Sequence, residues 1–231
     1  MKKLTYLVMV YNEIKTVKKA IEQVVNIKYK NKEIIVIDNG STDGSAEVIK
    51  KFGKIKKILR RKNLGAGKTM EEGFKIAKGD YIFIQYSDLE YDYKRSIYMK
   101  NYAIKNNLDI VLGSRLKNNK DSKLKIIFNK PAYLATIICT FLINVFYKKK
   151  FTDIIGGKLY KKSSIINIPI NSYHYGFDFE FISRACKKKL AIGEVFIKYK
   201  PRKNSSEKKI KFYHMVNALY EIFKVKFFEK V

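Results

Sequence analysis

Cysteine is scarce in this chain, and arginine and long apolar runs are scarce as well. Only two of the 231 residues are cysteines, Cys139 and Cys186, and neither lies in a CxxC pair or in a Cys/His cluster. A disulfide framework and a zinc site are therefore not expected. A reducing compartment such as the cytoplasm suits a chain of this composition.

No apolar run is long enough to cross a membrane. The longest stretch, Ala132–Tyr147, contains two threonines and an asparagine and is shorter than the roughly 20 residues that a spanning helix needs. The short apolar run Leu4–Val10 leads straight into a polar turn, which is not the pattern of a signal peptide. We therefore expect a cytoplasmic protein without a transmembrane span, whose longest apolar stretch is buried or lies at a membrane interface.

Lysine supplies almost all of an unusually large positive charge. The formal net charge is +28, from 49 Lys and Arg against 21 Asp and Glu, and only six of the basic residues are arginines. The simpler interpretation is a genome rich in A/T codons, which would give solvated lysines on helix faces. Attraction to anionic lipid or to nucleic acid is the functional alternative. The lysines are spread along the chain and no motif that binds RNA or DNA is apparent, so no nucleic-acid partner is expected.

Strand and helix patterns alternate through the first half of the chain. Segments with helical spacing separate five apolar runs that are typical of buried strands: Thr5–Val10, Glu33–Asp38, Ile55–Leu59, Tyr81–Gln85 and Asp109–Leu112. This alternation predicts an α/β fold with a mostly parallel sheet and helices on both of its faces. Ligands of such sheets sit beyond the carboxyl ends of the strands. The loops after these strands should therefore converge on one edge.

The second half is less regular, and neither a repeat nor a low-complexity linker separates it from the first half. Its expected elements are an apolar helix over Pro131–Phe146, a loop with Gly156 and Gly157, a helix over Phe177–Lys188, a strand over Val195–Tyr199 and a helix from about Ile210 to Phe228. We expect one domain over residues 1–231.

The loops after the predicted strands carry carboxylates, glycines and cations together, as a site for a metal and a nucleotide would. Asp88 and Glu90 follow the fourth strand, where a divalent cation finds carboxylate oxygens beside an incoming diphosphate. A pair of surface acids is the alternative. The turn from Gly65 to Lys68 is not a P-loop, because Lys62 occupies the place of that motif's first glycine. A glycine-rich turn at the start of a helix can still present amide groups to a diphosphate.

Eight blocks of sequence follow one another over nearly the whole chain: VMVYNE (Val8–Glu13), EIIVIDNGSTDGS (Glu33–Ser45), NLGAGK (Asn63–Lys68), AKGDYIFIQYSDLEYD (Ala77–Asp92), DIVLGSR (Asp109–Arg115), TDIIGGKLYKKS (Thr152–Ser163), YGFDFE (Tyr175–Glu180) and EVFIKYKPRKNSSEKKI (Glu194–Ile210). In this order they resemble the family 2 glycosyltransferases, and specifically the dolichol-phosphate mannose and glucose synthase group. The resemblance implies the GT-A fold, with a nucleotide-sugar-binding half at 1–115 and an acceptor-binding, membrane-facing half at 116–231.

The resemblance and the glycine-rich turn together assign roles to individual residues. The nucleotide sugar is expected to be bound by Tyr11, Glu13, Val36, Asp38, Gly65, Lys68 and Ser87. The expected ligands of Mg²⁺ or Mn²⁺ are Asp88 and Glu90. The residues expected to serve catalysis are Asp88, Arg115, Arg202 and Lys208. Three cations suit a lipid phosphate and a departing nucleoside diphosphate.

The activity that the resemblance implies is the transfer of a hexose, with inversion, from a nucleotide sugar of the GDP-mannose or UDP-glucose type to a polyprenyl or dolichyl phosphate. A phosphate monoester has a second pKa of about 6 and needs little help from a general base, so positioning supplies most of the catalysis. Basic, amphipathic helices would place the enzyme at the inner face of the cytoplasmic membrane. Transfer to a soluble glycan is the alternative.

One departure from the family pattern concerns the metal site, where Tyr86 replaces the first metal-site aspartate. A phenol with a pKa near 10 is neutral at pH 7 and is a poor magnesium ligand. Met9 and Asn39 depart from the pattern as well. Three outcomes are possible: an enzyme in which water completes the shell of Asp88 and Glu90, a slow enzyme, or a non-catalytic module that binds nucleotide sugar or lipid. We expect activity to be retained.

Overall fold

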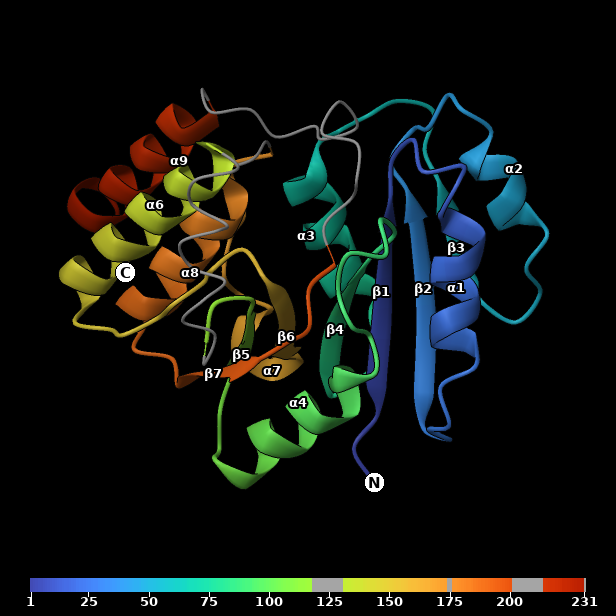
Figure 1. The fold of residues 1–231 in the computed structure, drawn as a ribbon, viewed down its shortest axis with the longest axis horizontal. Helices are drawn as coiled ribbons and strands as arrows, with labels where there is room; N and C mark the ends of the chain where they lie inside the picture. Colours follow the sequence, from blue (N-terminus) through green and yellow to red (C-terminus); the bar gives the residue numbers. More distant parts are fainter. Residues whose placement is uncertain (118–130, 174–175, 201–213, 231) are drawn as a thin grey trace.

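One seven-stranded sheet runs through the computed structural model, which describes residues 1–117, 131–173, 176–200 and 214–230 (Figure 1). The strands are β1 (Leu4–Val10), β2 (Lys32–Asp38), β3 (Lys56–Leu59), β4 (Tyr81–Tyr86), β5 (Ile110–Ser114), β6 (Gly157–Lys161) and β7 (Ile192–Phe196), in the order β3-β2-β1-β4-β6-β5-β7. The helices are α1 (Val17–Val25), α2 (Ser45–Lys50), α3 (Ala66–Ile76), α4 (Arg95–Lys105), α6 (Pro131–Tyr147), α7 (Lys162–Ile165), α8 (Phe177–Lys187), α9 (His214–Phe223) and the π-helical η2 (Lys224–Phe228).

The first four strands all run parallel to one another, and β5 and β7 form a second parallel pair. β1 pairs in parallel with both β2 and β4, and β2 pairs in parallel with β3. The sequence of β1 is apolar at almost every position because both of its faces are covered, and only Met9 in it is partly exposed. The five strands predicted for the first half are all present, with ends displaced by at most two residues. The predicted α/β architecture is confirmed.

Strand β6 was not predicted, and among the seven strands of the described residues it is the one that runs against its neighbours. It lies between β4 and β5 and is antiparallel to both. We predicted a loop here because Gly156 and Gly157 stand side by side. A Cβ atom on Gly156 would lie only 1.8 Å from the carbonyl oxygen of Gly113, so glycine permits a close approach of two strands at this point. The predicted loop is therefore wrong at Gly157, where β6 begins.

Two other elements of the second half differ from their predicted bounds. Strand β7 begins three residues before the predicted Val195, and the chain after it pairs with the β4–α4 loop only at the isolated bridge between Tyr91 and Tyr199. The last predicted helix is described from His214 and changes to a π-helix at Lys224. Residues 210–213 of that prediction lie outside the described residues.

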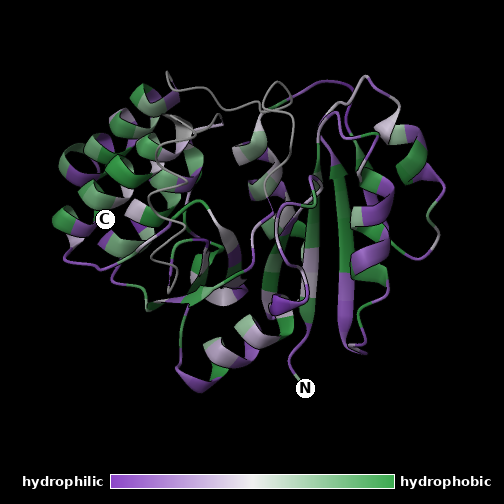
Figure 2. Ribbon diagram, in the orientation of Figure 1, coloured by the Kyte–Doolittle hydropathy of each residue, from purple (hydrophilic) through white to green (hydrophobic). Residues whose placement is uncertain are grey.

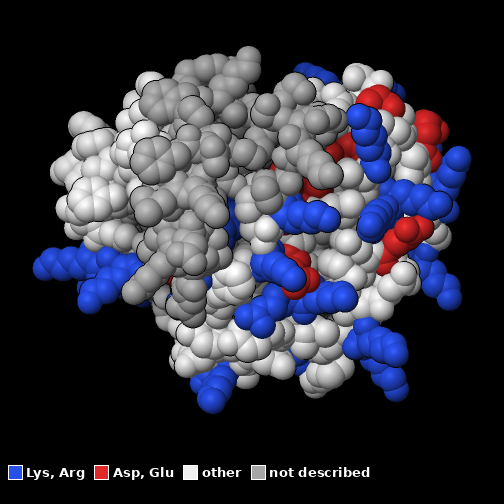
Figure 3. Space-filling model, in the orientation of Figure 1, with Lys and Arg blue, Asp and Glu red and all other residues white. Residues whose placement is uncertain are grey.

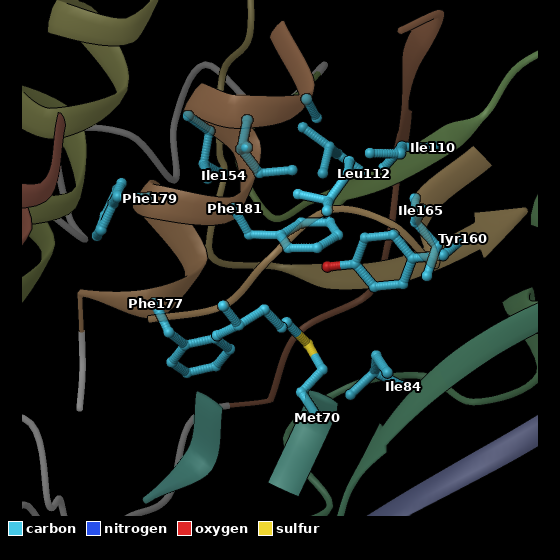
Figure 4. Close-up of a cluster of buried hydrophobic side chains, with 14 of the residues drawn as sticks. Met70, Ile84, Ile110, Leu112, Ile154, Tyr160, Ile165, Phe177, Phe179 and Phe181 are labelled. Carbon is cyan, nitrogen blue, oxygen red and sulfur yellow. The ribbon is translucent and has the colours of Figure 1, made fainter. Parts of the chain in front are cut away.

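Two clusters of buried side chains cover the two faces of the sheet. Successive residues of a strand point to opposite faces, so Leu7 belongs to one cluster and its neighbours Tyr6 and Val8 belong to the other. The cluster of Leu7 joins the sheet to α3, α6, α8 and α9. Within it the rings of Tyr160 and Phe181 meet edge to face at a centroid distance of 5.4 Å, and Figure 4 shows both residues. The other cluster joins the sheet to α1, α2 and α4.

Helices α6, α8 and α9 pack together at one end of the molecule (Figure 1). Figure 2 shows that α6 is mostly hydrophobic, whereas α1 alternates between polar and apolar residues along its length. None of the helices in the described ranges has the length and hydropathy needed to cross a bilayer.

Candidate active site

The carboxyl ends of β1, β2 and β4 meet at one edge of the sheet. Asp38 ends β2 opposite Val10, and Tyr86 ends β4 opposite Met9. The next residue, Ser87, is buried, and its hydroxyl donates a hydrogen bond of 2.9 Å to the carbonyl of Met9. The loops after β2 and β4 therefore leave the sheet on either side of β1 and at the same edge, as the parallel arrangement predicted.

The loops after β1 and β2 are joined by side-chain hydrogen bonds. The amide of Asn12 donates to the hydroxyl of Ser41 (2.8 Å), and the amide of Thr42 donates to the side-chain oxygen of Asn12 (2.8 Å). The buried carboxylate of Asp38 accepts bonds from the amide and the hydroxyl of Ser41, at 3.0 and 2.5 Å. Asp38 thus fixes the loop that follows its own strand.

Three further residues predicted to bind the nucleoside lie in different surroundings. Tyr11 and Glu13 follow β1 directly and are partly buried at the edge. The amide of Glu13 donates to the hydroxyl of Ser45 at 2.9 Å, which ties this loop to the start of α2. Val36 lies two residues before the end of β2 and is fully buried among apolar side chains. The structure does not bring its side chain to the surface of this edge.

The glycine-rich turn before α3 is shaped by contact with the segment before α8. A Cβ atom on Gly65, where φ is +88°, would lie 2.0 Å from the carbonyl oxygen of Tyr173, and one on Gly67 would lie 2.2 Å from that of Ser172. The amide of Gly67 donates to Tyr173 and the amide of Gly65 donates to Asn63. These two amides are used within the protein, so the contacts do not support the prediction that they cradle a diphosphate.

Two polar residues stabilise this turn. Lys68, in the first turn of α3, donates to Glu71 at 2.7 Å, and this bond raises the pKa of Lys68. The amide group of Asn39 donates to Asn63 (2.7 Å) and accepts from Arg60 (2.8 Å) and from the amide of Leu64 (3.0 Å). A carboxylate at this position could accept the bonds from Arg60 and Leu64, but it could not donate the bond to Asn63. The departure from the family pattern at Asn39 therefore has a structural explanation.

The two predicted metal ligands lie in the loop after β4, and both are partly exposed. A carboxylate oxygen of Asp88 accepts a bond from the amide of Glu90 (3.1 Å), and a carboxylate oxygen of Glu90 accepts one from the hydroxyl of Tyr199 (2.9 Å). The amide of Lys200 donates to the carbonyl of Glu90 (2.8 Å). The chain after β7 thus holds the loop that carries both carboxylates.

Asp88 and Glu90 fit one mode of metal binding. Within the ranges that the structure describes, no three His, Cys, Asp or Glu residues gather as a metal-binding group. In phosphate sites Mg²⁺ is commonly held by one or two carboxylates, water and the substrate phosphates. The paired carboxylates suit that arrangement, in which the diphosphate supplies the remaining charged ligands.

Tyr86 contacts a buried ion pair. Its phenol oxygen lies 3.4 Å from the ammonium of Lys158, which is fully buried on β6 and pairs with Asp178 at 3.0 Å. Burial, reinforced by the charge of Asp178, raises the pKa of Tyr86 well above its usual range, so the phenol is neutral. Burial also raises the pKa of Asp178, and the opposing effect of Lys158 is smaller. A neutral phenol therefore stands where the family pattern has a charged ligand.

The side chain of Arg115 is buried and contacts one carboxylate and two aromatic rings. Its guanidinium makes a bidentate pair with Asp153, at 2.6 and 2.8 Å, and lies over the rings of Tyr133 and Tyr199. Burial raises the pKa of Asp153, but Arg115 outweighs this effect and holds it below its usual range. The carboxylate of Glu194 accepts a hydrogen bond of 3.0 Å from the backbone amide of Asp153. The Arg115–Asp153 pair and the neighbouring Lys158–Asp178 pair form what we call the wall of the site, and the charge of Arg115 is already neutralised.

Three charged residues of this wall were not predicted from the sequence: Asp153, Lys158 and Asp178. Their signal was a charged residue within an apolar segment, since Lys158 interrupts the strand GKLYK and Asp178 stands between two phenylalanines. The other two predicted cations, Arg202 and Lys208, lie outside the described residues.

Comparison with known proteins places this chain in a family. The family model for Glycosyl transferase family 2 matches residues 5–168. The poly-beta-1,6-N-acetyl-D-glucosamine synthase of Staphylococcus aureus strain COL is 32% identical over 125 residues, which are 52% of this chain and 30% of that protein. The chain therefore matches less than a third of the length of this relative.

Solved structures of glucosyl-3-phosphoglycerate synthase from Mycobacterium tuberculosis share the fold. The complex with UDP has a TM-score of 0.74 at 13% identity and covers 99% of this chain and 82% of that one. The complex with Mn²⁺, UDP-glucose and phosphoglyceric acid has a TM-score of 0.69 at 12% identity, with 99% and 81% covered. Identities this low establish the fold alone, and the predicted GT-A fold is confirmed.

Proposed function

Because the chain belongs to glycosyl transferase family 2, we propose that it transfers a hexose, with inversion, from a nucleotide sugar to a polyprenyl or dolichyl phosphate. The nucleotide sugar would be of the UDP-glucose or GDP-mannose type. Residues 1–115 would bind this donor and residues 116–231 would bind the acceptor. The proposed subgroup is that of the dolichol-phosphate mannose and glucose synthases.

The placement of Asp88 and Glu90 carries the proposal. They lie beyond the carboxyl end of a parallel strand, where α/β sheets bind their ligands, and the chain after β7 holds their loop. Mg²⁺ or Mn²⁺ bound there would neutralise the departing nucleoside diphosphate. The similar synthase structures contain UDP with Mn²⁺ or with Mg²⁺, which supports this choice of cofactor.

The remaining residues divide between the donor and the acceptor. We propose that Tyr11, Glu13 and Asp38 shape the nucleoside site, with Asp38 acting through the loop that it fixes. Arg115 would position the wall without touching a phosphate, because Asp153 already occupies its guanidinium. Contact with the acceptor phosphate would then fall to Arg202 and Lys208.

A soluble acceptor is the second candidate. The glycosyltransferases that this chain resembles are named for a polysaccharide or for a phosphoglycerate product, and neither name indicates a lipid. A phosphate group is common to polyprenyl phosphate and phosphoglyceric acid, so an acceptor site built for a phosphate suits both.

The test offers purified protein a panel of radiolabelled UDP- and GDP-sugars with Mn²⁺ and three acceptors: polyprenyl phosphate, phosphoglyceric acid and a soluble glycan. Label in the organic phase supports the lipid acceptor, and label that stays in the aqueous product supports the second candidate. No transfer from any donor, together with calorimetric binding of UDP or GDP, would show a non-catalytic binding module and overturn the proposed activity.

A further inference from the structure

Exposed apolar side chains form one face over α6, α9 and η2, which we call the apolar face. Its members are Leu134, Phe141, Val145, Val216, Tyr220, Phe223, Phe227 and Phe228. Those on α9 and η2 recur from Val216 to Phe227 at three- and four-residue intervals, which is the spacing of one helix face. Phe228 is 82% exposed and Phe141 is 63% exposed. At the left of Figure 3, the visible described surface is mostly white, and Lys or Arg side chains lie along its lower border.

The helices that carry the apolar face pack against one another and against the core. The ring of Phe146 on α6 packs at 5.3 Å against Phe223 and at 5.6 Å against Phe227. The ammonium of Lys226 donates to the carbonyl of Phe146 at 2.9 Å. The inward sides of the same helices, with Ile143 and Ile222, are fully buried in the core. These contacts join the helices that carry the apolar face to one another and to the core.

Helix α6 has no polar outer side that would suit it to water. Its segment Pro131–Tyr147 contains no Asp, Glu, Lys or Arg. Surface helices of soluble proteins normally carry charged residues opposite their buried stripe, and contiguous exposed apolar patches mark sites of protein or membrane contact. The face is therefore expected to be covered in the working protein.

Lysines surround the apolar face at the ends of its helices. They are Lys148, Lys149, Lys150, Lys224, Lys226 and Lys230. The nearby acids on the described part of α9 and η2, and just after it, are Glu221, which pairs with Lys224 at 3.3 Å, and Glu229, which pairs with Arg184 at 2.5 Å. The border of the face is therefore positive. A second copy of the chain would set these like charges against one another, whereas an anionic lipid surface would neutralise them.

We propose that the apolar face docks on an anionic lipid bilayer, with its aromatic side chains in the interface and the lysines among the head groups. Helix α6 connects this face to the candidate site, because Tyr133 in its first turn lies under the guanidinium of Arg115 at 4.8 Å. Docking would bring a lipid phosphate to the acceptor side of the site. The inference rests on the proposed function for this purpose alone, since docking itself requires neither donor nor metal.

Flotation of the purified chain with vesicles tests the proposal. Phosphatidylcholine vesicles are compared with vesicles that also contain phosphatidylglycerol, without nucleotide or metal. We expect binding to the anionic vesicles only, and its loss at about 1 M salt, where the Debye length shrinks to about 3 Å. Lys148→Gln, Lys149→Gln and Lys150→Gln together should weaken partitioning on the order of 100-fold, since each lysine contributes about fivefold.

The aromatic contribution is tested with Phe141→Ser and Phe227→Ser, each expected to weaken partitioning about tenfold. Matched controls are Tyr98→Ser, an exposed aromatic on α4, and the triple Lys→Gln change at Lys50, Lys51 and Lys54 near α2; both should bind as the parent does. Equal binding of the parent to neutral and anionic vesicles would overturn the proposal. So would a dimer, seen by light scattering, that Phe227→Ser dissociates while vesicles bind nothing.

The proposed function can fail separately from docking. Vesicle binding without sugar transfer would sustain the docking and reject the activity. Sugar transfer to a soluble or short-chain acceptor by a chain that binds no vesicles would support the glycosyltransferase activity and reject the docking.

Discussion

The two halves of the molecule hold their polar residues in different ways. At the edge formed by β1, β2 and β4, carboxylates and amide side chains bind backbone amides and hydroxyls, as Asp38 binds Ser41 and Asn12 binds Thr42. In the second half, charges are buried as pairs, such as Arg115 with Asp153. The first arrangement shapes loops for a ligand, and the second builds a wall behind them. We infer that substitutions at the edge affect activity first and those in the wall affect stability first.

The largest expected effect is the loss of folding stability when a buried ion pair of the wall is broken. Arg115→Met leaves the carboxylate of Asp153 buried without its partner, and breaking a buried pair in this way costs about 3–5 kcal/mol. The matched control is Lys50→Met, which removes an exposed pair with Glu47 and should change stability by less than about 1 kcal/mol. Urea unfolding measures both. Equal losses of unfolding free energy in the two variants would show that the buried pair stabilises the fold no more than the exposed pair does.

At the edge, Asp88→Asn should lower sugar transfer on the order of 100-fold, because a metal that neutralises the leaving diphosphate loses a charged ligand. Its melting temperature should hardly change, since the side chain is partly exposed. Asp92→Asn, in the same loop, is the control and should retain activity. A large drop in the melting temperature of Asp88→Asn would show that Asp88 has a structural role like that of the wall residues, which would contradict the prediction.

The pH dependence of stability should follow Asp153. Arg115 depresses its pKa in the folded state, so the stabilisation is present above the unfolded pKa of about 3.9 and is lost as pH falls through the lower folded value. Each unit of depression contributes about 1.4 kcal/mol. Urea unfolding between pH 7 and 3 should show this acid loss in the parent and a flatter profile in Asp153→Asn, which is less stable at neutral pH.

Asp178 supplies the opposite sign for comparison. Burial raises the pKa of Asp178 in the folded state. Its contribution to folding stability is therefore fully present below the unfolded pKa and is lost as pH rises through the folded pKa. A parent that gains stability steadily down to pH 3 would contradict the role assigned to Asp153.

The smallest expected effect is at the junction of the two halves. Tyr86→Asp adds a carboxylate near Asp88 and should strengthen Mn²⁺ binding in the presence of UDP by roughly tenfold, because affinity follows the number of charged ligands. Tyr86→Phe keeps the ring and should leave Mn²⁺ affinity unchanged. Calorimetry measures both variants. No gain in Tyr86→Asp would show that the ammonium of Lys158, 3.4 Å from the phenol, takes up the new charge.

The predictions from sequence were most accurate where structure is local. The strands of the first half and the edge at which they end were predictable because apolar runs and polar turns alternate there. Strand β6 was missed because two adjacent glycines are typical of a turn, and only the carbonyl of Gly113 shows why they are needed. Gly65 and Lys68 were assigned to a diphosphate for the same reason, since the segment at Tyr173 that packs on this turn lies more than a hundred residues away.

The sequence by itself determined the α/β class, the family and the identity of Asp88 and Glu90 as the paired carboxylates after a buried strand. Those features depend on periodicity and short spacings, which neighbouring residues fix. The tertiary structure alone decided that Arg115 is neutralised by Asp153, that Tyr86 contacts the Lys158–Asp178 pair and that α6, α9 and η2 present one apolar face. Each of these depends on contacts between residues far apart in the chain, and burial gives such contacts their energetic weight.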